Sequence, residues 1–462
     1  MGIDDYPDEV ANPALNRSIL AVLFGTFTLR FSTGLTGVLL QTYLSKLHEH
    51  GGPRVTGLEV GILTAVFFLS ELTLSPPFGI LSDRLGTHRV MQWGPIFGVV
   101  AVLMTAVTTH SLVLALIGIP GVLIWLGATR LLEGAAAGAS IPSILGYIAA
   151  ATSHDAGLRG RTVARFEGAT FAGIGLGIVA AGLLYQLLGP AAFLVNAVVY
   201  ACSFLIYRYG VADLRHDLEV ANEPPRHFDL GAYLTLLRSS AVWLLAPTWI
   251  ALNAVLGSWA SQSVFQLVNE PKAKFEHQLL NGGLEPWQIS VGAAVALVVF
   301  FSGLVFWGNR LKRYRRTTVI GVGAGGGLLM LASAAALNHS HTFPWPVVGI
   351  LLIGVVFGIF ILAGATPAAL GLLADITEAH PEDRGALMGL YSVFLGTGQI
   401  IGGLAGGAGA DMAGIDGLLA VSTVLLLIAL VPLGRLRASE HIVDAHGEAG
   451  RQRMGKRNGS DG

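Results

Sequence analysis

Long apolar runs recur along this whole chain, and many of them carry no ionisable residue. The segments 287–307 and 418–434 are two of them, and roughly 20 such residues span the hydrocarbon core of a bilayer. A soluble protein carries about 25% charged residues, whereas this chain has 12% and is 53% hydrophobic. A buried helix of a soluble enzyme could explain one run but not about a dozen. The sequence therefore predicts an all-α integral membrane protein.

The apolar runs and the helix breakers between them predict twelve spanning helices in two sets of six. The first set lies near residues 18–45, 58–81, 89–116, 120–152, 161–187 and 190–208. The second set lies near residues 241–267, 287–308, 317–338, 346–374, 385–408 and 417–434. The predicted parts of the chain are an N-terminal segment 1–17, a six-helix bundle 18–208, a linker 209–240, a second bundle 241–436 and a tail 437–462. The polar composition of the tail predicts disorder.

Basic residues decide the orientation. Most Lys and Arg fall in loops on one side of the predicted membrane, and the loops of the other side hold only Lys46, Arg54, Lys272 and Lys274. Basic residues resist translocation, so the side rich in them is cytoplasmic. Both termini and the linker are therefore expected in the cytoplasm.

The two halves of the sequence are related to each other. One common offset superposes Pro142 on Pro367, Gly146 on Gly371, Arg159 on Arg384, Gly173 on Gly398 and Gly177 on Gly402. Single glycine matches arise easily by chance in a chain with 61 glycines, but an ordered series across successive elements does not. Parallel halves of this kind are a transporter architecture, with the substrate site at mid-depth between them.

A loop motif follows the second predicted span. It reads Gly79-Ile-Leu-Ser-Asp83-Arg84-Leu-Gly86-Thr-His-Arg89. This closely resembles the cytoplasmic loop signature of the major facilitator superfamily, and a degenerate copy at 309–316 begins with Asn in place of the acidic residue. An Asp beside a helix end can cap free backbone amides and meet the positive end of the helix dipole.

The resemblance covers essentially the whole chain. It implies the superfamily fold, with two pseudo-symmetric six-helix bundles. It also implies that Asp83, Arg84 and Arg89 hold the halves together on the cytoplasmic side while the protein is open outward. The alternative is that the loop serves only as a positive-inside anchor and a tight turn.

Two further motifs resemble family elements. Arg130-Leu-Leu-Glu133-Gly134 in the fourth span is similar to an Arg-x-x-Gln-Gly element associated with proton-coupled members, with Glu133 in place of the amide. The glycine series 173–182 in the fifth span is similar to an antiporter motif, although Ile178 stands where that motif has proline. The resemblance thus implies proton coupling and, more weakly, antiport.

Ionisable residues inside the predicted spans all belong to the first half. They are Arg30, Glu71, Arg130, Glu133, Arg165 and Glu167. Charges at membrane depth are costly, face one another or a watery cavity, and are functional candidates by default. The first four lie deepest and are expected to form the proton-coupling constellation of the central cavity; the alternative is permanent salt bridges that fix helix packing. Arg165 and Glu167 lie near the cytoplasmic end and are expected to be gate or structural residues.

The predicted spans of the second half carry uncharged polar residues instead of ionisable ones. The substrate-cavity candidates are Asn253, Trp259, Gln262, Gln266, Tyr391 and Gln399. They suggest that the ligand is not held there by a formal counter-charge, although each residue alone could equally join one helix to another.

Together these features predict a secondary active transporter in the cell membrane, monomeric, that exports a drug-like or metabolite substrate coupled to protons. The alternatives are uptake of a small solute, translocation of a lipid, and a non-transporting membrane sensor. The net charge of −1 and the single Cys202 favour neither a nucleic-acid partner nor a thiol metal cluster. The His pairs 48/50 and 339/341 are incomplete metal sites. No nucleotide loop or catalytic constellation lies outside the spans, so we expect no enzyme activity and no cofactor.

Overall fold

The computed structural model describes residues 13–153, 155–213, 240–311, 313–379 and 384–458. Every regular element in these ranges is a helix, which confirms the all-α prediction. Nine described segments are long and apolar enough to cross a membrane, and two of these are 54 and 47 residues long. Because one crossing takes roughly 20 residues, each of these two is long enough for two crossings.

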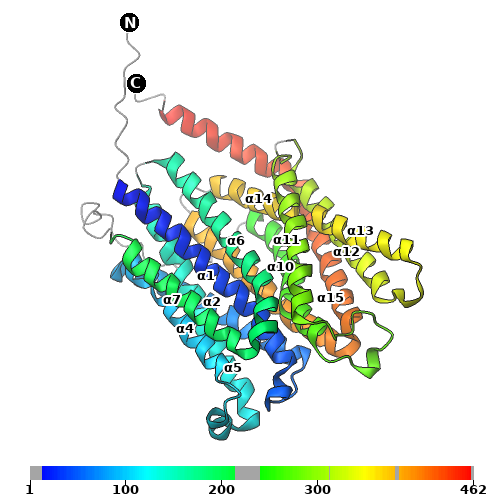
Figure 1. Ribbon diagram of the computed structural model, residues 1–462. Coiled ribbons are helices and arrows are strands. Elements are labelled where there is room, and N and C mark those ends of the chain that lie inside the picture. The colour runs from blue at the N-terminus through cyan, green and yellow to red at the C-terminus, as the bar shows by residue number, and fades with distance from the viewer. Residues whose placement is uncertain (1–12, 154, 214–239, 312, 380–383, 459–462) are drawn as a thin grey trace. The chain divides into compact units, whose positions relative to one another are not determined.

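Two compact units divide the chain (Figure 1). The first comprises Met1–Tyr43, His48–Pro53 and Leu69–His227, and the second comprises Leu44–Leu47, Arg54–Phe68 and Phe228–Gly462. Helix α2 therefore begins in the second unit and ends in the first. The predicted linker 209–240 lies largely outside the described residues.

The N-terminal half consists of long helices joined by short turns. Its elements are α1 (Pro13–Ser45), η1 (Leu47–His50), α2 (Gly57–Leu85), α3 (Thr87–Val90), α4 (Trp93–Ala106), α5 (Ser111–Ala151), α6 (Ala156–Leu188), η2 (Gly189–Ala191) and α7 (Ala192–Gly210). The third span ends earlier than predicted, at Ala106, and α5 is interrupted by Gly118 at φ 64°. The apolar run 112–117 hid this break, because a short helix and the end of a span have the same composition.

The C-terminal half contains α10 (Ser240–Val268), η3 (Ala273–Phe275), α11 (Pro286–Gly308), α12 (Arg316–Asn338), η4 (Ser340–Thr342), α13 (Trp345–Leu362), α14 (Ala365–Ala379) and α15 (Arg384–Asn458). The predicted span 346–374 is broken into α13 and α14. Helix α15 is interrupted at Ala413 and Gly414, where the φ of Gly414 is 64°, a conformation that glycine adopts without steric cost. Its two arms, 384–412 and 415–458, contain the last two predicted spans, 385–408 and 417–434. The second arm continues into the tail predicted to be disordered, where Ala, Glu, Gln, Arg and Lys, residues of high helix propensity, stand among the glycines.

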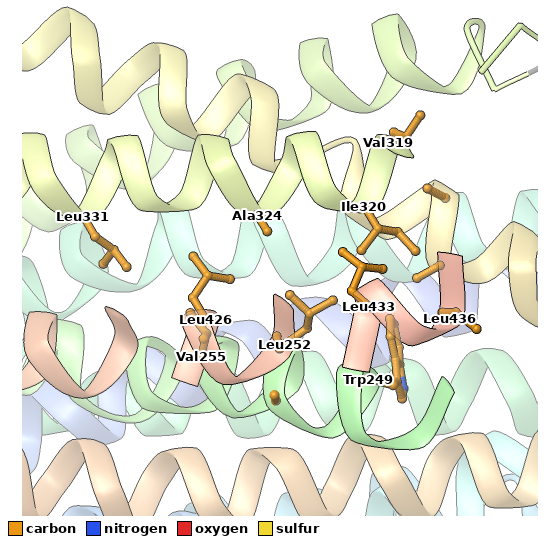
Figure 2. Packing of buried hydrophobic residues seen from close by; sticks show 14 of the residues in the cluster. Trp249, Leu252, Val255, Val319, Ile320, Ala324, Leu331, Leu426, Leu433 and Leu436 are labelled. Carbon is orange, nitrogen blue, oxygen red and sulfur yellow. The ribbon is translucent and has the colours of Figure 1, made fainter. Parts of the chain in front are cut away.

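Apolar side chains of four helices, α10, α12, α14 and α15, form the core of the second unit. Trp249, Leu252 and Val255 of α10 lie among residues of α12 and of the second arm of α15 (Figure 2). The contributors from those two helices include Val319, Ile320, Ala324, Leu331, Leu426, Leu433 and Leu436. Helices in a bilayer are held by such close van der Waals packing rather than by exclusion of water.

Glycines bring equivalent helices together in the same way in both units. A Cβ added at Gly173 of α6 would lie 2.9 Å from Arg30 Cβ of α1, and one added at Gly398 of α15 would lie 2.6 Å from Asn253 Cβ of α10. The approach is reciprocal, since a Cβ at Gly257 of α10 would lie 2.7 Å from Gln399 Cα. This is the shared packing that the sequence repeat predicts.

Candidate functional site

Arg130 and Glu133 form a buried ion pair on α5. They are one helical turn apart, so their side chains share a face, and these are 8% and 5% exposed. The guanidinium contacts the carboxylate, yet the Arg130 Nε has no hydrogen-bond partner in the described part of the chain. Tyr200 of α7 is also buried and lies within electrostatic range of both charges. Unmet hydrogen-bonding capacity at a buried charge is unusual and often accompanies function.

Arg30 of α1 lies within electrostatic range of two carboxylates, Glu71 on α2 and Glu167 on α6. Arg30 and Glu71 are half-buried, whereas Glu167 and its neighbour Arg165 are exposed. The first unit therefore holds two charge clusters, one around Arg30 and one around Arg130.

Helix α2 is anchored to α5 between these clusters. The Ser70 hydroxyl donates a hydrogen bond of 2.7 Å to the carbonyl of Leu131, next to Arg130. A Cβ added at Gly138 of α5 would lie 3.3 Å from the Glu71 carbonyl oxygen. The short side chains therefore let the stretch of α2 that carries Glu71 pack closely against the helix that carries the ion pair.

The loop motif 79–89 turns at Gly86, whose φ of 93° is readily adopted only by glycine. Asp83 and Arg89 are exposed, and within the described residues the Asp83 carboxylate accepts no hydrogen bond. The residue that fixes the loop is His88, which sequence reasoning passed over. Its ring Nε2 lies 3.0 Å from the carbonyl oxygen of Tyr207 in α7.

Gly79 and Arg84 belong to the same motif. A Cβ added at Gly79 would meet only Pro142, at 3.9 Å, and Arg84 is exposed. The latch role expected for Asp83, Arg84 and Arg89 therefore stays a prediction.

The polar candidates of the second unit differ in their contacts. Asn253 and Gln262 donate hydrogen bonds to backbone carbonyls, and Gln266 donates to the side chain of Gln262. Trp259 Nε1 and Gln399 Oε1, in contrast, are buried atoms without a hydrogen-bond partner among the described residues. The Tyr391 side chain lies outside the described residues. Trp259 and Gln399 are thus the two candidates with an unused donor and an unused acceptor.

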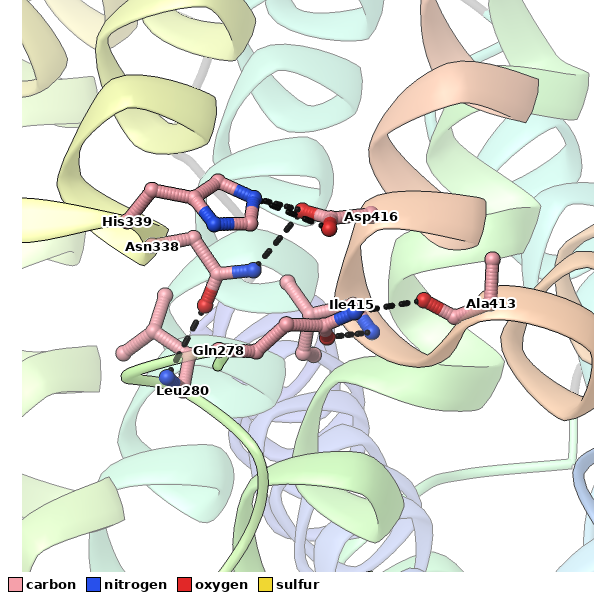
Figure 3. A network of polar contacts seen from close by, with 7 residues as sticks. All are labelled: Gln278, Leu280, Asn338, His339, Ala413, Ile415 and Asp416. Carbon is pink, nitrogen blue, oxygen red and sulfur yellow. Dashed lines mark hydrogen bonds and ion pairs between the residues drawn. The ribbon is translucent and has the colours of Figure 1, made fainter. Parts of the chain in front are cut away.

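A polar network at the turn of α15 was not foreseen. The Asp416 carboxylate accepts a hydrogen bond of 2.8 Å from Asn338 and lies 2.9 Å from the ring of His339 (Figure 3). Gln278, in the loop after α10, donates to the Ala413 carbonyl and accepts from the Ile415 amide, and so clamps both sides of the break. In the sequence, this network could have been suspected from Asp411 and Asp416, the two acidic residues beside the predicted turn.

Comparisons with known proteins agree with this architecture. The family model described as Major Facilitator Superfamily matches residues 22–366 and 288–456. A solved structure, described as the crystal structure of the nucleoside transporter NupG, has a TM-score of 0.66 at 16% identity and covers 91% of this chain and 98% of that chain. The structure of a point mutant of the same transporter has a TM-score of 0.64 at 15% identity, covering 90% of this chain and 99% of that one. At such low identity these structures show the fold alone.

A relative with a curated description is the quinolone resistance protein NorA of Staphylococcus aureus, which is 31% identical over 135 residues. The alignment covers 29% of this chain and only 30% of NorA, so this chain matches less than a third of that relative's length. The family model, in contrast, extends through both halves, from α1 into the second arm of α15. This chain is therefore a multi-pass membrane protein that belongs to the Major Facilitator Superfamily of transporters.

Proposed function

We propose that this transporter exports a small amphipathic molecule through the cell membrane in exchange for protons, by rocking of its two halves about a central site. The observation that carries the proposal is the asymmetric distribution of charge. Within the predicted spans, ionisable residues occur in the first half alone, and the spans of the second half carry uncharged polar residues. Proton coupling and ligand binding can then reside in different halves and still share one cavity.

The protonation step is assigned to the carboxylates of Glu71 and Glu133. When Glu133 takes up a proton it loses its charge, and the Arg130 guanidinium loses its counter-ion. Because a buried unpaired charge is costly, Arg130 must then move or find another partner. Release of the proton restores the pair. Arg30 modulates Glu71 in the same manner, so both clusters couple a proton to a movement of helices.

Ligand recognition is assigned to the second half. Trp259 Nε1 supplies a hydrogen-bond donor and Gln399 Oε1 an acceptor, and both atoms are buried and unpartnered in the described structure. Asn253, Gln262, Gln266 and Tyr391 remain candidates. A ligand that satisfies these groups is uncharged on that side and carries both an acceptor and a donor. The partial similarity to a quinolone resistance protein supports export of a drug-like molecule.

The test is transport by the purified monomer in liposomes with an imposed pH gradient. The probes are a fluorescent quinolone, a tritiated nucleoside and a fluorescent phospholipid, compared between wild type, Glu71→Gln, Glu133→Gln and the exposed control Glu49→Gln. We expect the quinolone to accumulate in the acidic lumen with wild type and Glu49→Gln, and not with Glu133→Gln. Unchanged flux in both Glu71→Gln and Glu133→Gln would remove these carboxylates from the mechanism.

The same assay separates the other transport modes. Nucleoside movement in the direction of the proton flow indicates uptake by symport. Movement of the phospholipid alone indicates lipid translocation. Absence of flux for every probe, in protein that unfolds cooperatively, contradicts the export proposal and favours a non-transporting membrane sensor.

A further inference from the structure

The outer end of α2 carries its own cap, but that cap is incomplete. The Thr56 hydroxyl accepts from the Glu59 amide at 3.2 Å, and the Glu59 carboxylate accepts from the Thr56 amide at 2.7 Å. This reciprocal arrangement is a capping box. It leaves the amides of Gly57 and Leu58, among the first four of the helix, without a partner inside the helix.

Asp411 at the end of the first arm of α15 takes up these two amides. Its Oδ1 accepts from Gly57 at 2.7 Å and its Oδ2 from Leu58 at 2.8 Å. The carboxylate is half-buried and lies at the positive end of the α2 dipole, where a negative charge is favoured. Both oxygens of one side chain are therefore committed to the start of a helix more than 350 residues earlier in the chain.

The Gly57 carbonyl is held from the other side. Gln262 Nε2 of α10 donates to it at 2.9 Å. A Cβ added at Gly57 would lie 2.9 Å from the Gly407 carbonyl oxygen and 3.1 Å from Asp411 Oδ1. The backbone of α2 thus touches α15 directly, and any side chain at position 57 would separate them.

This docked stretch of α2 is short. Residues Arg54–Phe68 cluster with the second unit, whereas the helix from Leu69 onward clusters with the first. In the first unit α2 is fixed to α5 through Ser70 and the Leu131 carbonyl. One continuous helix is therefore bonded at one end to α15 and, two residues beyond the docked stretch, to α5.

We infer that Asp411 is the latch of the outer gate: it holds the start of α2 against α10 and α15 while the outer side is closed, and it releases the Gly57 and Leu58 amides when that side opens. This inference rests on the proposed alternating access. The expected role of Asp83 on the cytoplasmic side is the counterpart. Within the described ranges Asp411 accepts hydrogen bonds from Gly57 and Leu58, whereas the Asp83 carboxylate accepts none.

A permanent staple is the alternative, in which α2 never leaves α15. The position of the bonds favours a latch. Asp411 and Gln262 bind backbone groups at the end of α2, so these bonds can break without disrupting the hydrogen bonds of the helix interior. Thr56 and Glu59 keep the first turn of α2 capped after release, so opening exposes only two amides to water.

The first test measures the distance between spin labels at Leu58 and Met412, both exposed, in protein whose Cys202 is replaced by Ala. We expect one short distance in the parent and a second, longer population in Asp411→Asn. An amide offers one acceptor oxygen where the carboxylate offers two, and we expect the ratio of open to closed protein to rise about fivefold. An unchanged distance distribution in both Asp411→Asn and Asp411→Ala would overturn the inference. This arm needs no substrate.

The second test joins Leu58→Cys to Met412→Cys with a short reducible bifunctional reagent. A latch that must open predicts loss of quinolone or nucleoside flux in linked protein and recovery after reduction. The matched control joins Lys274→Cys to Met412→Cys, because the Lys274 ammonium lies 3.2 Å from the Met412 carbonyl oxygen within the second unit. Full flux in protein linked at Leu58 identifies a staple. If the unlinked protein moves no probe, the proposed function fails, and the distance measurement still decides the latch.

Discussion

Arg30 of α1 and Asn253 of α10 occupy equivalent positions in the two units, each with its Cβ beneath a glycine of the neighbouring long helix. Duplication therefore gave the two halves the same packing, while a cation stands in one half and a neutral amide in the other. The two positions share their packing geometry and differ in charge, so charge can be changed at Arg30 without a change in how the helices fit.

Replacement of Arg30 by Asn gives the first unit the residue that the second already accommodates. We expect Arg30→Asn to fold, because Asn fits beneath the glycine of the other unit. Flux driven by the pH gradient is expected to fall about tenfold, the effect of about 1.4 kcal/mol of lost charge interaction. The measurement is quinolone transport with and without the gradient. Equal loss in both conditions contradicts a role in coupling.

The ion pair of α5 predicts a pattern of stability. Glu133→Met leaves the Arg130 charge buried and unpaired, which is expected to destabilise by about 3–5 kcal/mol. The double variant Arg130→Met/Glu133→Met removes both charges and is expected to recover most of that loss. Thermal unfolding in detergent measures both. A double variant less stable than Glu133→Met argues against this account of the pair.

Glycines of α6 predict opposite effects at two positions in one helix. Gly173→Ala places a Cβ 2.9 Å from Arg30 Cβ and is expected to cost about 1–3 kcal/mol through overpacking. Gly168→Ala meets nothing within 4 Å and is expected to stabilise by about 0.5–1 kcal/mol. The unfolding midpoints of the two variants check this difference in sign.

Asp155 caps α6 outside the membrane. Its carboxylate accepts from the amides of Leu158 and Gly157, and these bonds with the nearby Arg161 lower the pKa of Asp155 below its usual value. A carboxyl whose pKa is lower in the folded protein stabilises above its unfolded value of about 3.9 and loses this effect as pH falls through the folded pKa.

We therefore expect protection of the Gly157 and Leu158 amides from hydrogen exchange, corrected for intrinsic rates, to decrease in acid. Asp155→Asn keeps a capping oxygen without a titrating group, and its protection is expected to be independent of pH. The same acid-induced loss in Asp155→Asn assigns the effect to another group.

The bonds of Gln278 predict the behaviour of the loop 269–285. Gln278→Ala leaves the Ile415 amide and the Ala413 carbonyl without their partner (Figure 3), at a cost of about 1–3 kcal/mol for buried groups. Limited proteolysis is expected to cut this loop faster in the variant. The exposed neighbour His277→Ala keeps both bonds and serves as the control.

Membrane spans were predictable because lipid permits few backbone arrangements, so apolar length alone indicates a helix. The family and its fold followed from Asp83 and its loop, and both are confirmed. The break within 346–374 was not predicted, because a turn within apolar sequence leaves no compositional mark. The early end of the third span at Ala106 was marked by the polar residues Thr108, Thr109 and His110, which the prediction placed inside the span.

Contacts between residues far apart in sequence were the other gap. Gln262 is a cavity candidate because it is a polar residue in a predicted span. Its hydrogen bond to Gly57 depends on where α2 packs. Asp411 lies between two predicted spans, and its bonds to the two amides of α2 depend on contacts that the sequence does not give. The sequence lists candidate polar groups, but tertiary packing decides which of them are already bonded and which, like Trp259 Nε1, keep an unused donor.

The incomplete cap of α2 bears on how the protein is made. The ribosome delivers α2 to the bilayer long before Asp411 exists, and during that interval Thr56 and Glu59 alone keep the helix from fraying. Emergence of α15 then supplies the missing acceptors, so completion of an early helix waits for one of the last segments to be synthesised. Truncation before residue 411 is thus expected to yield a nascent chain whose second span is inserted but loose at its outer end.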